Sequence, residues 1–206
     1  PISFAAAMTS FLEIFESNGN VVYGFLDDDE TTHGTEILEY SVFGSTDDHG
    51  FLKLIGQKCD SFVTTENIQE RKTAVNTLIE KRKVMPINCI HPNVSISTFA
   101  SIGHGNLINS GTVIGPDSTL GSHCQIQINS AISDNTTVGD FVQIGANATI
   151  GTNVTIEDEC FIGAGVTIID GLKIGKGSRI GAGSVVMEDV KAGGTVFGVP
   201  AKEYSV

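Results

Sequence analysis

Residues 144–156 read IGANATIGTNVTI, a stretch in which an isoleucine recurs every six residues. The spacing continues in both directions without a break, so that seventeen aliphatic residues occupy every sixth position: Ile90, Ile96, Ile102, Ile108, Ile114, Leu120, Ile126, Ile132, Val138, Ile144, Ile150, Ile156, Ile162, Ile168, Ile174, Ile180 and Val186. Glycine directly follows nine of these positions, and the fourth residue after them is usually small. A fixed short period of this kind is the sequence signature of a β-helix.

The period has a physical reason. Each six-residue unit supplies one short strand and one corner, with the aliphatic side chain inside and glycine adopting backbone conformations closed to other residues. Three units make a coil of about 18 residues, each coil burying the apolar layer of its neighbour. We therefore predict a parallel β-helix of about five coils within residues 85–206. Its flat faces favour association into a closed homotrimer.

Residues 1–84 have the pattern of a small α/β domain. Helical spacing of apolar residues marks 4–17 and 65–84, with a possible helix at 51–56. Strands are expected at 21–26, 37–43 and 61–63, and this alternation predicts a Rossmann-like parallel sheet. Asp27 and Asp28 follow the first of these strands, where the carboxyl end of a buried strand meets a ligand crevice. A solvated acidic loop is the alternative interpretation of these residues.

Composition and charge exclude several classes of function. A formal net charge of -12 argues against non-specific nucleic-acid binding, which needs a basic surface. No apolar run approaches the length of a membrane span, and no secretion signal is evident. The four cysteines are scattered without metal-ligand spacing, which is typical of reduced, buried thiols in the cytoplasm.

Positive charge is concentrated near the C-terminus. No lysine or arginine occurs from residue 88 to residue 172, after which come Lys173, Lys176, Arg179, Lys191 and Lys202. Cations of this kind suit the phosphates of coenzyme A (CoA). A solvated surface at the end of the β-helix explains them equally well.

Several motifs in a fixed order give the chain a resemblance to a known family. They are Val22-Tyr23-Gly24-Phe25-Leu26-Asp27-Asp28, then Ile90-His91-Pro92, Val138-Gly139-Asp140-Phe141-Val142, and finally Gly198-Val199-Pro200-Ala201-Lys202. With the hexapeptide repeat, they resemble the acetyltransferases of bacterial nucleotide sugars, of the sialic-acid and bacillosamine types. The resemblance implies a left-handed β-helix, a homotrimer, acetyl-CoA bound between neighbouring helices and a UDP-sugar held by the N-terminal domain.

The resemblance also implies where ligands bind. The first strand of the family's nucleotide domain is missing, and Ser3 and Phe4 are what remains of its phosphate-binding turn. Acetyl-CoA is expected near the later coils, with the pantetheine against backbone amides and the phosphates near cations. The residues expected there are Gln143, Gly145, Ala146, Gly163, Ala164, Lys176, Arg179 and Lys202.

The catalytic positions depart from the family pattern. Two histidines of the family correspond here to Asp134 and Gln143. A histidine with a pKa near 6.5 is a good base at neutral pH, whereas an aspartate, at about 3.9, is a weaker one. Asp134 is therefore a candidate base better suited to an amine than to a hydroxyl, or else a turn residue. His123 precedes Phe141 by one coil and is the second candidate base, or else an exposed corner residue.

Several functions remain open at this point. We expect N-acetylation of a UDP-linked amino sugar in surface-polysaccharide synthesis. The alternatives are a sugar O-acetyltransferase and a degenerate trimer that binds sugar nucleotide and CoA without chemistry. Nucleotidyltransferase-like and γ-carbonic-anhydrase-like uses of the same helix are further possibilities. The five scattered histidines disfavour the anhydrase, so no metal is expected.

Overall fold

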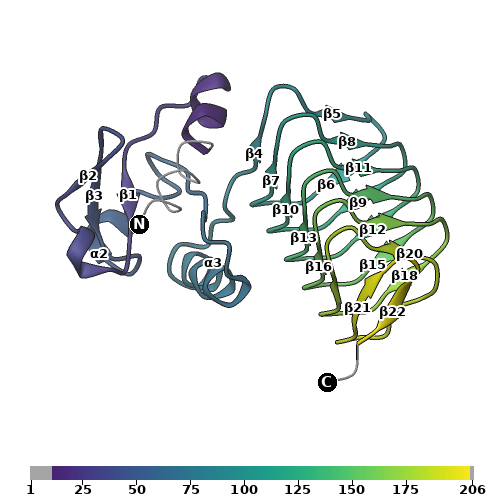
Figure 1. Ribbon diagram of the computed structural model, residues 1–206. Coiled ribbons are helices and arrows are strands. Elements are labelled where there is room, and N and C mark those ends of the chain that lie inside the picture. Colours follow the sequence, from purple (N-terminus) through teal and green to yellow (C-terminus); the bar gives the residue numbers. More distant parts are fainter. Residues whose placement is uncertain (1–10, 205–206) are drawn as a thin grey trace. The chain divides into compact units, whose positions relative to one another are not determined.

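The computed structural model describes residues 11–204. The chain divides into two compact units, Pro1–Pro92 and Asn93–Val206 (Figure 1). The first unit is mixed α/β, and the second is a parallel β-helix.

The first unit contains a small sheet accompanied by helices. Residues 11–17 are helical. The elements that follow are β1 (Phe25–Leu26), the 3-10 helix η1 (Glu30–Thr32), β2 (Glu36–Ile37), β3 (Tyr40–Gly44), α2 (His49–Leu52), α3 (Ile68–Arg82) and β4 (Cys89–Ile90). The sheet has the order β1-β3-β2, with β1 parallel and β2 antiparallel to β3.

This sheet differs from the parallel one expected from the sequence. The segment 37–43 is a hairpin, because Leu38 and Glu39 both have positive φ (50° and 70°), as a tight two-residue turn requires. Residues 61–65 form no strand. The strand expected at 21–26 is limited to β1. The described part of this unit is thus a mixed sheet.

Helix α3 organises the core of the first unit. It begins at Ile68 because the side chain of Asn67 accepts hydrogen bonds from the backbone N–H groups of the first turn, and it ends at a left-handed Lys83. Leu78 packs in one cluster with Leu52 and Ile55. The cluster gives this unit an apolar centre of its own.

The second unit winds through three faces in turn (Figure 1). The first face contains β7 (Leu107–Ile108), β10 (Gln125–Ile126), β13 (Gln143–Ile144), β16 (Phe161–Ile162), β19 (Arg179–Ile180) and the terminal hairpin β21 (Thr195–Gly198) and β22 (Ala201–Glu203). The second face contains β5 (Ser95–Ile96), β8 (Val113–Ile114), β11 (Ala131–Ile132), β14 (Thr149–Ile150), β17 (Thr167–Ile168) and β20 (Val185–Val186). The third face contains β6 (Ser101–Ile102), β9 (Thr119–Leu120), β12 (Thr137–Val138), β15 (Thr155–Ile156) and β18 (Lys173–Ile174).

Residues that are eighteen apart pair along every face. Gln125 pairs with Gln143 on the first face, Ala131 with Thr149 on the second, and Thr137 with Thr155 on the third, all in parallel register. The predicted 18-residue coil is therefore confirmed. The aliphatic residue of every hexad from Ile108 to Val186 is at most 2% exposed, so these side chains form the core.

The corners need a residue with positive φ. Asparagine supplies it at Asn129, Asn135, Asn147 and Asn153, with φ between 55° and 59°. Asparagine tolerates this conformation better than most residues. The corner conformation is therefore encoded locally and repeats with the coil.

No helix among residues 11–204 is long and apolar enough to cross a membrane.

Burial predicts how the four thiols react. It raises the pKa of the Cys89 thiol to about 12 and that of Cys160 above its usual value, and Cys124 is fully buried. Cys59 is half-buried, and burial raises its pKa as well. Since the thiolate is the reactive form, we expect a disulfide reagent at pH 8 to label one thiol slowly in the native protein and all four in denaturant.

The control for this labelling is Cys59→Ser, which should abolish the native-state reaction. Rapid labelling of two or more thiols in the native protein would contradict the buried arrangement.

Candidate active site

Three columns of corners carry both candidate bases and the glycine–alanine pairs predicted to bind the cofactor. The first–second corner follows each strand of the first face and includes residues 145–148, 163–166 and 181–184. The second–third corner includes 115–118, 133–136 and 151–154, and the third–first corner includes 121–124 and 139–142. Each corner lies directly above its equivalent in the preceding coil, because the coils pair in register.

Asp134 lies on the second–third corner and is exposed. Its carboxylate folds over the corner one coil earlier, where a Cβ added to Gly115 would collide with Oδ1 of Asp134. Its backbone carbonyl accepts a hydrogen bond from the N–H of Asn153 (3.1 Å). The backbone of Asp134 is thus fixed in the corner column, while its side chain faces solvent.

His123 lies on the third–first corner and stacks on Phe141, one coil later. The ring centroids are 4.8 Å apart with an interplanar angle of 30°. The expected one-coil relation between them is confirmed, but the alternative that His123 is an exposed corner residue is wrong, because it is 4% exposed. Both residues have positive φ (61° and 58°), the conformation that the corners of the β-helix require, although it is uncommon for bulky side chains.

The two candidate bases do not meet within one chain. Asp134 and His123 occupy different corner columns, which lie at opposite ends of the third-face strands such as β9 and β12. They are therefore competing assignments and not two parts of one cluster.

Gln143 begins strand β13 and belongs to a ladder of amides. Its Nε2 donates to Oε1 of Gln125 at 3.1 Å, and Gln125 is 4% exposed. One N–H of Gln143 is therefore engaged inside the chain.

The first–second corner carries a column of glycine–alanine pairs: Gly145-Ala146, Gly163-Ala164 and Gly181-Ala182. A Cβ on Gly145 would lie 2.5 Å from the backbone nitrogen of Ala164, and one on Gly163 would lie 2.6 Å from that of Ala182. Only glycine allows this approach. Ala182 was not among the residues predicted from the sequence, although the pair repeats 18 residues after Gly163.

The alanine amides of this column are open. At the other two corners, an aspartate one coil later accepts from the equivalent N–H: Asp140 from Ser122 (2.7 Å), Asp158 from Asp140 (3.0 Å) and Asp170 from Thr152 (2.8 Å). In the glycine–alanine column an alanine takes the place of this aspartate, and its side chain has no oxygen that could accept the hydrogen bond. Among residues 11–204, no acceptor is found for the backbone N–H of Ala146, Ala164 or Ala182. A row of such donors suits the carbonyl oxygens of an extended ligand.

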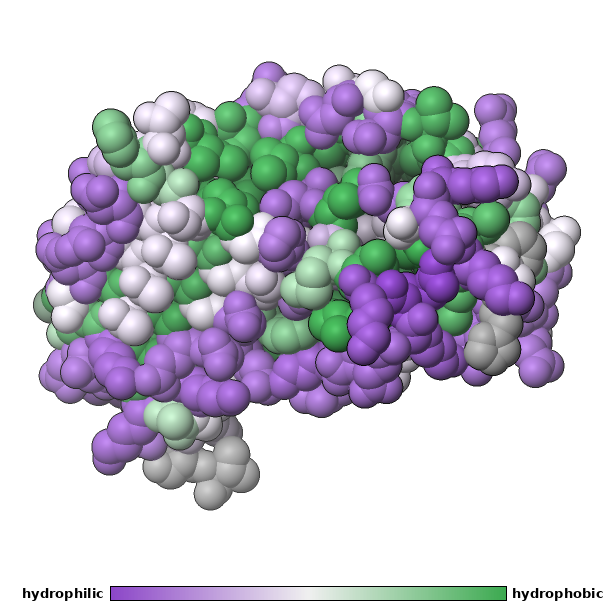
Figure 2. All heavy atoms as spheres, turned by 180° about the vertical axis from the view of Figure 1, so that it is seen from behind, coloured by the Kyte–Doolittle hydropathy of each residue, from purple (hydrophilic) through white to green (hydrophobic). Residues whose placement is uncertain are grey.

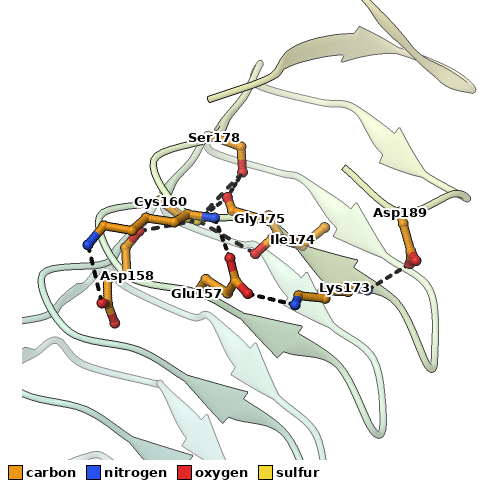
Figure 3. A network of polar contacts seen from close by, with 9 residues as sticks. Glu157, Asp158, Cys160, Lys173, Ile174, Gly175, Ser178 and Asp189 are labelled. Atoms are coloured by element: carbon orange, nitrogen blue, oxygen red, sulfur yellow. Dashed lines mark hydrogen bonds and ion pairs between the residues drawn. The ribbon is translucent and has the colours of Figure 1, made fainter. Parts of the chain in front are cut away.

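The predicted cations differ in how far they are neutralised. Nζ of Lys176 lies 3.6 Å from Asp158 and 3.2 Å from Glu159. Glu157 bonds Nζ of Lys173 at 2.7 Å and the backbone N–H of Lys176 at 2.8 Å (Figure 3), and these bonds lower the pKa of Glu157. Lys176 is therefore largely balanced by acids of the chain itself.

Arg179 and Lys202 are better placed to meet an anion. The guanidinium of Arg179 lies over the ring of Phe161, 4.8 Å from its centroid, an arrangement that leaves its N–H groups for other acceptors. The side chain of Lys202 is 70% exposed, and its Nζ lies 3.9 Å from the still more exposed carboxylate of Glu188. Both belong to strands joined to the first face, since β21 pairs with β19 and with β22.

The candidate substrate residues of the first unit brace a loop. Asp28 accepts from the backbone N–H and hydroxyl of Thr46, both at 2.8 Å, and Asp27 accepts from the N–H of Asp29 at 2.9 Å. Ser3 and Phe4 lie outside the described residues. Within 11–204, no group of three or more His, Cys, Asp or Glu side chains is arranged to hold a metal ion.

Comparisons with known proteins match this geometry. Residues 117–152 and 153–188 match the family described as bacterial transferase hexapeptide (six repeats). No curated protein sequence matches the chain. Among solved structures, it is similar to a histidine-to-alanine variant of the GDP-perosamine N-acetyltransferase of Caulobacter crescentus with CoA and GDP-perosamine. The identity is 25% and the TM-score 0.87, over 97% of this chain and 93% of that one.

A second likeness is the acetyltransferase domain of PglB from Neisseria gonorrhoeae in complex with acetyl-CoA. Its identity is 26% and its TM-score 0.86, over 96% of this chain and 94% of that domain. These findings confirm the resemblance to hexapeptide-repeat sugar acetyltransferases. WeeI from Acinetobacter baumannii, with 24% identity and a TM-score of 0.53 over 93% of this chain and 91% of that one, shares the fold.

The open alanine amides can be tested by replacing one with proline. Pro116 occupies the position equivalent to Ala164 at another corner, so this position accepts proline without changing the corner. We expect Ala164→Pro to raise the Kd for CoA about five- to tenfold, because one hydrogen bond to the cofactor is lost. Calorimetry measures this Kd.

The matched control is Ala164→Ser, which keeps the N–H and should bind CoA nearly as the wild type does. Equal affinities of the proline and serine variants would show that this amide does not contact the cofactor.

Proposed function

We propose that this protein transfers the acetyl group of acetyl-CoA to the amino group of a nucleotide-linked sugar. The observation that carries the proposal is the likeness, across both units, to a nucleotide-sugar N-acetyltransferase solved with CoA and its sugar substrate. The exposed Asp134 and the open amide column give that reaction a base and a cofactor cradle within the second unit.

The chemistry needs a deprotonated amine held against a thioester. A base takes one proton from the sugar ammonium, and the amine nitrogen then attacks the thioester carbon. The C–N bond forms, the C–S bond breaks, and the sulfur of CoA leaves with the second proton of the nitrogen. Proximity supplies much of the acceleration when the acceptor is an amine. We assign the role of base to Asp134, because a carboxylate can accept a proton from an ammonium but is badly matched to a sugar hydroxyl.

The cofactor is proposed to lie along the first–second corner. The pantetheine would meet the amides of Ala146, Ala164 and Ala182, and the phosphates would reach Arg179 and Lys202. Gln143 is proposed to lie beside the cofactor, because its strand β13 leads directly into this corner. Lys176 contributes less than these two cations, because Asp158 and Glu159 already neutralise it.

The acceptor is proposed to be an amino sugar joined to a nucleoside diphosphate. The sequence resemblance implies a uridine nucleotide, and a GDP-sugar occupies the solved transferase. We assign nucleotide binding to the first unit, where the loop carrying Asp27 and Asp28 is braced by hydrogen bonds. The proposed setting is polysaccharide synthesis in the cytoplasm.

We further propose a homotrimer of left-handed β-helices with roughly parallel axes. The residues that begin the strands of the second face are all uncharged: Ser95, Val113, Ala131, Thr149, Thr167 and Val185. Exposed apolar side chains border them at Ile128, Ile169 and Met187. Figure 2 shows weakly polar and apolar surface beside a band of hydrophilic side chains.

The position of this face explains why a trimer would be needed. The second face lies between the corner that carries Asp134 and the corner that carries the open amides. A single chain therefore presents the two halves of the site at opposite edges of one face. A closed ring would bring the Asp134 edge of one subunit to the amide edge of the next.

Sedimentation tests this assembly. We expect a species of three times the 21.7 kDa chain mass. Val113→Arg, on the second face, should dissociate it, because three buried cations would be left unpaired. The control Thr119→Arg, on the third face, should remain trimeric. A monomeric wild-type protein would remove the basis for a site shared between subunits.

Activity is tested with acetyl-CoA and a panel of nucleotide-linked amino sugars, following thiol release. We expect Asp134→Ala to lower kcat/KM about 100-fold and Asp134→His to preserve or raise it. Asp170→Ala, at the same corner two coils later, is the matched control and should stay active.

The competing base is tested in the same assay with His123→Ala. Loss of activity in this variant, with Asp134→Ala still active, would move the base to the third–first corner. A wild type that binds CoA but is inert with every amino sugar and hydroxyl acceptor would favour the degenerate binder instead, which the missing family histidines make a specific alternative.

A further inference from the structure

Four aspartates occupy the same position in the corners of the β-helix. Asp134 and Asp170 lie on the second–third corner, and Asp140 and Asp158 on the third–first corner. Each is the second residue after the aliphatic residue of its hexad. Each also lies one coil above a glycine, at which an added Cβ would collide with the Oδ1 of that aspartate: Gly115, Gly151, Gly121 and Gly139 respectively.

Three of these carboxylates are tied to the backbone. The residue after the glycine donates its N–H to Oδ1, at 2.7 Å for Ser122 to Asp140, 3.0 Å for Asp140 to Asp158 and 2.8 Å for Thr152 to Asp170. A hydrogen bond from a backbone amide to a carboxylate is charge-assisted and stabilises the ionised form. These three aspartates are therefore structural caps of the corner.

The fourth carboxylate lacks this bond for a reason written in the sequence. The residue after Gly115 is Pro116, which has no N–H to donate. The carboxylate of Asp134 lies over Gly115 as the other three lie over their glycines. Among residues 11–204, we find no hydrogen bond to it. Asp134 thus keeps the position of a corner cap without the bond that makes the others caps.

We propose that Pro116 is a positioning residue that keeps the Asp134 carboxylate available to the acceptor amine by withholding the backbone donor. A carboxylate bonded to an amide is held in place and has a lone pair already occupied, so an N–H at residue 116 would fix Asp134 against its own chain and away from the acceptor amine. The inference rests on the proposed function, because it assigns the base of that reaction.

The test is Pro116→Ala, which restores the donor that the three equivalent corners possess. In the acetyl-transfer assay, we expect kcat at pH 7 to fall about tenfold, with the KM for acetyl-CoA unchanged. A loss confined to kcat separates a positioning role from a general structural defect, which would also change the KM for acetyl-CoA. Pro116→Ser repeats the test if the alanine variant is poorly folded.

A double-mutant cycle tests whether Pro116 acts through Asp134. Pro116→Ala should have no effect on the residual kcat of Asp134→Ala, because the added N–H then has no carboxylate to bind. Ser122→Ala is the matched control: it keeps the N–H that bonds Asp140 and should leave kcat unchanged. Wild-type kcat in Pro116→Ala would overturn the proposal.

Nuclear magnetic resonance provides a readout that does not depend on activity. The amide proton of residue 116 in Pro116→Ala should be protected from exchange with solvent, because it donates to the Asp134 carboxylate, and this protection should vanish when Asp134→Ala is added. An amide at 116 that shows no such protection would overturn the inference even in an active enzyme. If the wild type is inert with every acceptor, the proposed function fails, while the exchange measurement still decides whether Pro116 withholds a donor from Asp134.

Discussion

Parallel strand pairing that places residues eighteen apart in register is the constraint on which the second unit depends. This pairing stacks equivalent residues in columns, so the aliphatic residues meet only one another inside, and each corner meets only the same corner of the next coil. Because the columns repeat one environment, a change of residue within a column changes the chemistry without changing the fold.

The corner columns show this separation of fold from chemistry. Where an aspartate follows one coil later, the corner N–H is covered and the corner is only structural. Alanine in that position leaves a donor open, and proline leaves an acceptor open. The proposed cofactor cradle and the proposed base are thus two variations of the same corner hydrogen bond. The cradle lacks the side-chain acceptor, and the base lacks the backbone donor. An acidic chain can also build a local anion site in this way, since amides attract phosphate and carbonyl oxygen without net charge.

The β-helix was predictable because its contacts are periodic in the sequence. The interior positions from Ile108 to Val186 and the coil length followed from spacing alone. The first unit was harder to predict, because its hairpin depends on Leu38 and Glu39 in a backbone conformation that their side chains do not favour. The burial of His123 depends on stacking with a ring eighteen residues away, which an apparently polar corner does not reveal. Asp134 could be chosen from the family pattern, but its separation from His123 required the assignment of corners to faces.

The column of glycine–alanine corners also spaces its amides at fixed intervals. Neighbouring strands of a sheet are about 4.8 Å apart, so the amides of Ala146, Ala164 and Ala182 follow one another at intervals of that size. An extended ligand would bind along this column only if its own polar atoms have the same spacing as the amides, and it could shift along the column only by one whole interval. The number of coils between the proposed base and the proposed cation site would then set the length of ligand that fits, and inserting or deleting one coil would change that length while leaving every individual contact intact.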